Sequence, residues 1–133
     1  MIQEAGTVVV GDEEQLARFI LFSKWIRSSD QTVKPEAFLP DPNFELSVTR
    51  HLALTDEALW NVGENVAAAS ARNLHGRADI GAGFVRQQSL NVDSAPVQNN
   101  PNHANIINWP PDKPAQKIIA LVLASHSVYR VKP

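Results

Sequence analysis

The sequence predicts a single α+β domain with three helices and a mixed or antiparallel sheet of about four to five strands. The chain has 133 residues, which is close to the commonest size of one domain. Hydrophobic residues make up 44% of it and charged residues 20%, as is typical of a globular protein. Helix and strand patterns follow one another without the strict alternation of a doubly wound parallel sheet. We therefore expect residues 1–133 to share one hydrophobic core.

Three segments carry the pattern of a helix. The segment 12–28 begins with an acidic turn and continues with apolar residues over an arc of roughly 200°, which is wider than the stripe of a surface helix. Thr55 is a good N-cap for a second helix over 56–71, and Asp112 is one for a third helix over 113–126. The wide apolar arc of the first helix predicts either an interface with a partner or insertion into a deep core.

Other segments carry the pattern of a strand. Alternation over 45–52 predicts a strand with one solvent-exposed face, with Arg50 on the apolar side. The segment 78–84 alternates as well, although Gly81 and Gly83 favour a bulge there. Proline-rich residues 28–43 are expected to form a loop. The full set of predicted strands is 45–52, 78–84, 90–92, 103–109 and 128–131.

Composition and charge exclude several classes of function. The chain has no cysteine, which excludes disulfides, thiolate catalysis and cysteine-ligated metals. Its formal net charge of −2 argues against non-specific binding to nucleic acid. The apolar run 118–124 is too short to span a bilayer, which needs about 20 residues, and residues 1–6 do not resemble a secretory signal. We expect a cytoplasmic protein without a membrane partner.

The common catalytic and cofactor motifs are absent from the sequence. It contains no GxGxxG, P-loop, HExxH, GxSxG or EF-hand pattern. The four histidines, at 51, 75, 103 and 126, have no short ligand spacing. We therefore expect neither a cofactor nor a metal site.

The segment 102–110 is the strongest candidate for chemistry. If strand alternation continues through it, His103, Asn105 and Trp109 share one face. An imidazole and an amide beside a large aromatic ring would suit a planar or phosphorylated ligand, with His103 as catalytic proton donor or acceptor. The alternative is structural: His103 caps the preceding turn, Asn105 bonds a backbone group and Trp109 fills the core.

Lys113 is a candidate for binding an anion beyond this strand. It lies in the first turn of the predicted third helix, where a cation opposes the helix dipole. Together with the free N–H groups of that turn, it could hold a phosphate or a carboxylate. Otherwise it is an exposed lysine that Asp112 neutralises.

Three further basic residues are candidate ligand-binding residues. Arg50 interrupts an apolar strand face and so needs a partner, either an acid such as Asp79 or a ligand oxyanion. His75 and Arg77 flank Gly76, and they either join the same basic pocket or lie in a surface loop.

Two functional hypotheses follow from these residues. The first is a small ligand-binding or protein-interaction module, which we expect to bind a small anion or to form a homodimer or a protein complex through helix 12–28. The second is a metal-independent enzyme acting on a phosphorylated or nucleotide substrate. In that enzyme His103 is the acid or base, and Arg50 and Lys113 stabilise negative charge.

Overall fold

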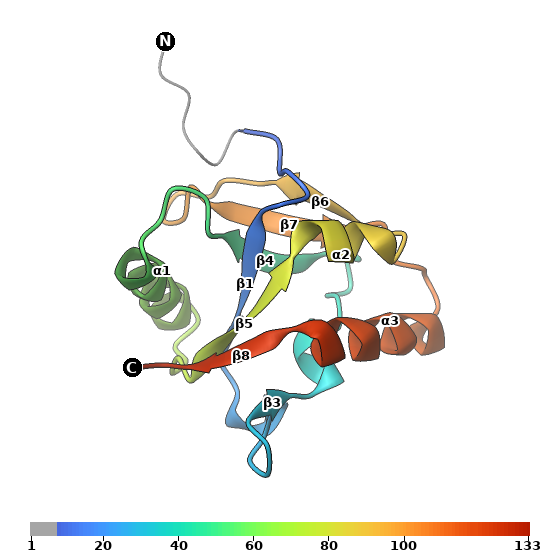
Figure 1. Cartoon of the computed structure of the whole chain (residues 1–133), viewed down its shortest axis with the longest axis horizontal. Helices are drawn as coiled ribbons and strands as arrows, with labels where there is room; N and C mark the ends of the chain where they lie inside the picture. The colour runs from blue at the N-terminus through green and yellow to red at the C-terminus, as the bar shows by residue number, and fades with distance from the viewer. Residues whose placement is uncertain (1–7) are drawn as a thin grey trace.

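The computed structural model describes residues 8–133 and contains one large sheet (Figure 1). The sheet has six strands in the order β6-β7-β4-β1-β5-β8, and each neighbouring pair is antiparallel. The fold is thus α+β as predicted, with six strands in this sheet rather than four to five. The strands are β1 (Gln15–Ile20), β4 (Leu46–Arg50), β5 (Gly76–Gly81), β6 (Asn91–Ser94), β7 (His103–Ile107) and β8 (Val128–Val131), and a separate hairpin pairs β2 (Ile26–Arg27) with β3 (Thr32–Val33).

The predicted second and third helices are confirmed, and their caps explain where they begin. The Thr55 hydroxyl accepts a bond from Ala58 N at 3.1 Å, and the Asp112 carboxylate accepts one from Ala115 N at 3.1 Å. No helix within residues 8–133 is long and apolar enough to cross a membrane. The α-helices are α1 (Asp56–Ala69), α2 (Ala82–Gln87) and α3 (Lys113–His126), and the 3₁₀ helices are η2 (Ser23–Trp25) and η3 (Pro35–Phe38).

The predicted helix over 12–28 is wrong, because this segment contains the central strand β1. Leu16 and Ile20 are buried on one face of the sheet, and Ala17 and Phe19 are buried on the other. A strand buried on both faces reads as an apolar run that periodicity cannot distinguish from a helix. Leu16, Ala17, Phe19 and Ile20 fill two cores within the chain, so the helix on which the predicted interface rested is not formed.

The predicted strand over 78–84 is correct only in its first part. Strand β5 begins earlier, at Gly76, and ends at Gly81, which precedes helix α2 as its N-cap rather than forming a bulge. Helix α2 places Ala82 and Val85 in the core, so the apolar residues after Gly81 are buried by a helix instead of by strand alternation.

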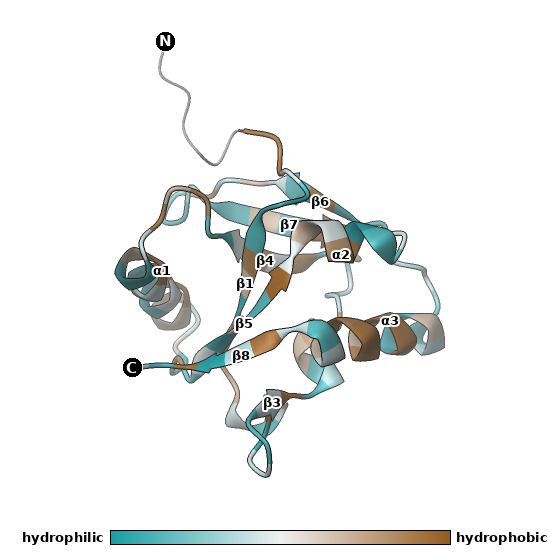
Figure 2. Ribbon diagram, in the orientation of Figure 1, coloured by the Kyte–Doolittle hydropathy of each residue, from teal (hydrophilic) through white to brown (hydrophobic). Residues whose placement is uncertain are grey.

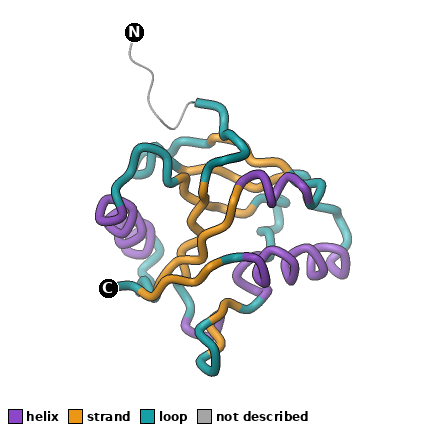
Figure 3. Tube along the Cα trace, viewed as in Figure 1, coloured by secondary structure: helices purple, strands orange, loops and turns teal. Residues whose placement is uncertain are grey.

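Helices cover the two faces of the sheet unequally (Figures 1 and 3). Helices α2, α3 and η3 pack over the face that carries Leu16, Val48 and Ile106, and together they form the larger core. Helix α1 packs over the opposite face only at β1 and β5, where Ala17 and Phe19 lie under Leu59 and Ala67. Figure 2 shows both hydrophobic and hydrophilic residues along the strands of the sheet.

The sheet consists of two three-stranded halves joined by a very short contact. Strands β1 and β4 pair only at Leu16↔Arg50 and Ala17↔Thr49. In contrast, β1 and β5 form six residue pairs, and β4 and β7 form four. Beyond the two pairs, β1 residues 18–20 and β4 residues 46–48 have no ladder between them, and we call this opening the sheet fork.

Gly63 provides a test of how closely α1 packs on β1. A Cβ added at Gly63 would lie 2.7 Å from Phe19 Cε1 and 3.0 Å from Leu74 Cδ2. We therefore expect Gly63→Ala to lower the free energy of unfolding by about 1–3 kcal/mol, even though alanine favours a helix by about 1 kcal/mol. Urea denaturation measures the change. Phe19→Leu in the same chain should reduce the cost, and a Gly63→Ala protein as stable as wild type would contradict the close packing.

Candidate functional site

The side chain of Arg18 fills the sheet fork. Its Nε donates to Ala37 O at 2.7 Å, and its Nη1 donates to Ser47 O at 3.1 Å. The guanidinium carbon also lies 5.4 Å from the centre of the Trp25 ring. Arg18 thus supplies a hydrogen-bond donor to a β4 carbonyl at a point where β1 has moved away from β4.

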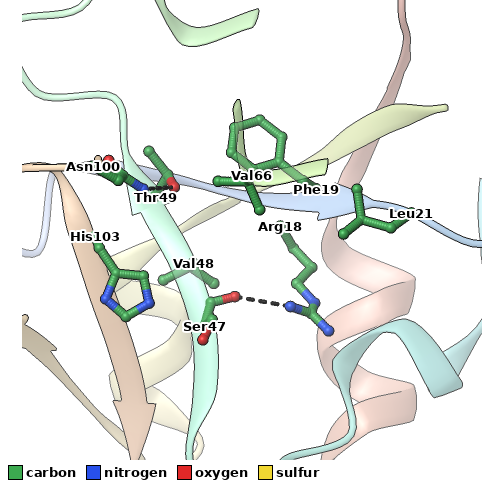
Figure 4. A pocket seen from close by; sticks show the side chains of 9 residues that line it. All are labelled: Arg18, Phe19, Leu21, Ser47, Val48, Thr49, Val66, Asn100 and His103. Atoms are coloured by element: carbon green, nitrogen blue, oxygen red, sulfur yellow. Dashed lines mark hydrogen bonds between the residues drawn. The ribbon is translucent and has the colours of Figure 1, made fainter. Parts of the chain in front are cut away.

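A small cavity of about 50 Å³ opens at the fork (Figure 4). This volume is far below the roughly 300–1,000 Å³ of a ligand pocket, so the space suits one carboxylate or phosphate group rather than a whole metabolite. Its walls come from β1, β4, β7, α1 and the turn before β7. The lining residues are Arg18, Phe19, Leu21, Ser47, Val48, Thr49, Val66, Asn100 and His103.

Two hydrogen bonds fix polar groups at this cavity. Asn100 Nδ2 donates to the Thr49 hydroxyl at 2.8 Å, which leaves the hydroxyl hydrogen free to be donated elsewhere. His103 Nδ1 lies 2.7 Å from Ala95 O. Because a carbonyl only accepts, Nδ1 carries the hydrogen of this bond. In residues 8–133 no partner is found for His103 Nε2, so this nitrogen is available to a ligand.

Arg18 carries a charge that no acid neutralises in the described part of the chain. The ion pairs of residues 8–133 do not include it, and both of its hydrogen bonds go to neutral carbonyls. Burial lowers the pKa of Arg18 to about 10, which still leaves the guanidinium protonated at neutral pH. The fork therefore presents a half-buried positive charge beside a small cavity.

Arg50 lies next to the fork but on the opposite face of the sheet from His103. Its neighbour Thr49 pairs with His103, so strand alternation turns Arg50 towards the larger core. There it is fully buried and donates to Glu14 through Nε at 2.8 Å and through Nη2 at 2.7 Å. Arg50 thus has an acidic partner, as one alternative predicts, but this partner is Glu14 rather than Asp79.

Asp79 instead forms the centre of a second ionic cluster. Arg77 Nε, Arg130 Nε and His51 Nε2 each lie 3.0 Å from one of its carboxylate oxygens. Arg77 also donates to Asp56 at 2.6 Å, and this hydrogen bond lowers the pKa of Asp56. Arg77 is therefore a buried residue of β5 that holds α1 against the sheet, not a residue of a surface loop or of a pocket with Arg50.

Trp109 does not share a face with His103. Asn108 adopts the left-handed region with a φ of 70°, which interrupts the alternation that the sequence predicts. The Trp109 ring consequently enters the larger core, and its Nε1 donates to Ile106 O at 3.0 Å. Asn105 stays on the His103 face of β7, although it does not line the cavity.

The two remaining candidates line separate pockets. Lys113 contributes to a pocket of about 270 Å³ with the proline-rich residues 40–44. His75 contributes to a basic pocket of about 530 Å³ near η2. The structure does not bring Arg50, Lys113, His75 or Arg77 to the cavity that His103 lines.

The sequence argument missed Arg18, Thr49 and Asn100. One signal was present: Arg18 is the only charged residue in the strand segment Leu16–Ile20, which is the same observation that singled out Arg50. Thr49 and Asn100 gave no such signal, because a Thr in a strand and an Asn in a turn are both common.

The described residues contain no candidate metal site. Across residues 8–133, no group of three or more His, Asp or Glu side chains could hold a metal ion.

Comparison with known proteins does not indicate a function. No family model matches the sequence, and comparison with curated proteins and with solved structures gave no significant match. The function must therefore be argued from the geometry of the site.

The Glu14–Arg50 pair predicts a loss of stability in acid. Burial by itself raises the pKa of Glu14, but hydrogen bonds from Arg50 and Gly11 N, with the charges of Arg50 and Arg86, hold it below the ordinary value of 4.5. A carboxyl whose pKa is lowered by folding stabilises the folded state. The stabilisation is complete when the pH is above the ordinary pKa, and it is lost as the pH falls through the lowered pKa.

We expect wild type to lose stability below pH 4.5 and Glu14→Gln to lose less over the same range. At neutral pH, Glu14→Gln should cost about 3–5 kcal/mol, because the buried Arg50 guanidinium loses the charge of the Glu14 carboxylate. Urea denaturation at a series of pH values measures both effects. Parallel pH profiles for the two proteins would contradict a lowered pKa at Glu14.

Proposed function

We propose that this protein binds small anionic ligands through one phosphate or carboxylate group that enters the sheet fork and contacts Arg18. One observation carries this proposal. The Arg18 guanidinium lies beside the cavity, and it has no carboxylate partner in residues 8–133. A cation withdrawn from water without a counter-ion is unfavourable, and a bound anion would remove that cost. Charge-assisted hydrogen bonds are also stronger than those to the neutral carbonyls of Ala37 and Ser47.

The groups around Arg18 support the same chemistry. Arg18 Nη2 has no partner in the described part of the chain, and the Thr49 hydroxyl can donate its hydrogen. Both donors suit the oxygens of an anion. Phe19 and Val66 form an apolar wall that limits solvent at the fork. The remainder of a larger ligand would lie outside the cavity, over the part of the sheet that α1 leaves uncovered.

Inorganic phosphate is the first ligand to test. A ligand that binds only the folded state stabilises it by about 2.7 kcal/mol at 100 times its Kd, so phosphate should raise the Tm of wild type. Arg18→Gln should abolish this increase, and Arg18→Lys should retain part of it because the charge remains. Differential scanning calorimetry over a phosphate series, at constant ionic strength, measures the effect.

A matched variant separates binding from the general effect of phosphate on protein stability. Arg27 is an exposed arginine of β2 that also donates to a backbone carbonyl, Val33 O, and it does not line the fork cavity. Arg27→Gln should keep the full phosphate-dependent increase in Tm. Equal increases in wild type, Arg18→Gln and Arg27→Gln would refute the proposed site.

A second candidate function is acid–base catalysis at the same cavity, favoured by the fixed tautomer of His103. Because Nδ1 donates its hydrogen to Ala95 O, the lone pair of a neutral His103 imidazole lies on Nε2, which could accept a proton from an attacking water molecule. With a phosphate ester held by Arg18, the water oxygen would form a bond to phosphorus while the bond to the leaving oxygen breaks.

This second candidate predicts turnover of 4-nitrophenyl phosphate. His103→Gln should lower kcat by about 10²–10⁴-fold, and it should bind inorganic phosphate as well as wild type does. Release of nitrophenolate measures turnover, and calorimetry measures binding. If wild type binds phosphate but hydrolyses no ester, the binding function alone is supported.

A further inference from the structure

A second group of basic side chains gathers near the end of β1. The basic pocket, as we call it, lies between the segment 21–24 and the segment 71–75 that follows α1. Its volume is about 530 Å³, which is within the range of small-molecule sites. The lining residues are Leu21, Phe22, Ser23, Lys24, Ala71, Arg72, Asn73 and His75, and none of them is acidic.

One aromatic ring holds two of these cations close together. Arg72 Cζ lies 4.2 Å from the centre of the Phe22 ring, and Lys24 Nζ lies 5.6 Å from the same point. The two charges are therefore within about 10 Å of each other, close to the screening length at 0.1 M salt. Cation–π attraction to Phe22 positions these like charges without neutralising them.

No acid in the described part of the chain compensates this charge. Several other arginines pair with carboxylates, as Arg50 does with Glu14 and Arg86 does with Asp12. The ion pairs of residues 8–133 include neither Lys24 nor Arg72. The pocket is thus lined by positive charges and by no acidic residue, although the whole chain has a formal net charge of −2.

We propose that the basic pocket binds a polyphosphate group, either free or as part of a small phosphorylated molecule. Pyrophosphate spreads its negative charge over two phosphoryl groups, which suits two cations held within about 10 Å of each other better than a single small anion does. The His75 imidazole and the Asn73 amide line the same pocket and supply further hydrogen-bonding groups. This inference does not depend on the proposed anion site at the sheet fork.

Isothermal titration of the full chain with pyrophosphate tests the proposal. The double variant Lys24→Gln/Arg72→Gln should weaken pyrophosphate binding at least tenfold. The control Arg27→Gln/Lys117→Gln removes the same net charge from one lysine and one arginine outside the pocket, and its affinity should stay close to that of wild type. Melting curves without ligand show that both double variants fold.

Arg18→Gln separates this pocket from the fork. Leu21 lines both the pocket and the fork cavity, so the two sites are neighbours. If pyrophosphate occupies the basic pocket, Arg18→Gln should leave its affinity within about twofold of wild type, whatever happens to the binding of inorganic phosphate. The proposal is overturned if wild type does not bind pyrophosphate, if both double variants lose affinity equally, or if only Arg18→Gln loses it.

Discussion

The contact between β1 and β4 determines the form of the whole sheet. Only two residue pairs join the half made by β6, β7 and β4 to the half made by β1, β5 and β8. Backbone groups beyond these pairs cannot use ladder bonds, yet buried backbone groups need partners. Arg18 donates to one of these groups, Ser47 O, and also to Ala37 O of η3, and Arg50 fills the core beside the junction. A longer β1–β4 ladder would close the fork and remove its cavity.

Two arginines, Arg50 and Arg77, are buried and a third, Arg18, is half-buried, and the partners of the three differ. Arg50 and Arg77 are neutralised by carboxylates, Glu14 for the first and Asp56 and Asp79 for the second. These two contribute to the structure because their charge is already compensated. Arg18 makes hydrogen bonds of comparable length, but only to neutral carbonyls. The lengths of their hydrogen bonds do not distinguish the three arginines. The presence or absence of a carboxylate partner in residues 8–133 separates the proposed binding residue, Arg18, from the two structural ones.

The unequal cover of the two faces explains why polar groups remain available near the fork. Helices α2 and α3 close one face of the sheet, whereas α1 covers the other only over β1 and β5. Strands β4 and β7 therefore present Thr49 and His103 beside the edge of α1. Leu21 also lines the proposed polyphosphate pocket. Basic side chains without an acidic partner in residues 8–133 thus line two neighbouring pockets of a protein whose overall charge is slightly negative.

Local signals in the sequence determined the elements that depend on local physics. Caps at Thr55 and Asp112 located α1 and α3, and alternation located β4 and β7, because capping and side-chain parity act within a few residues. Tertiary structure decided what depends on neighbours distant in the chain. The segment 12–28 contains a strand because apolar surfaces cover both of its faces. Trp109 does not lie on the His103 face, because the left-handed backbone of Asn108 interrupts the alternation of side chains. The pairing register between strands brought Arg18 and His103 to one cavity, and no pattern within either segment encodes that register.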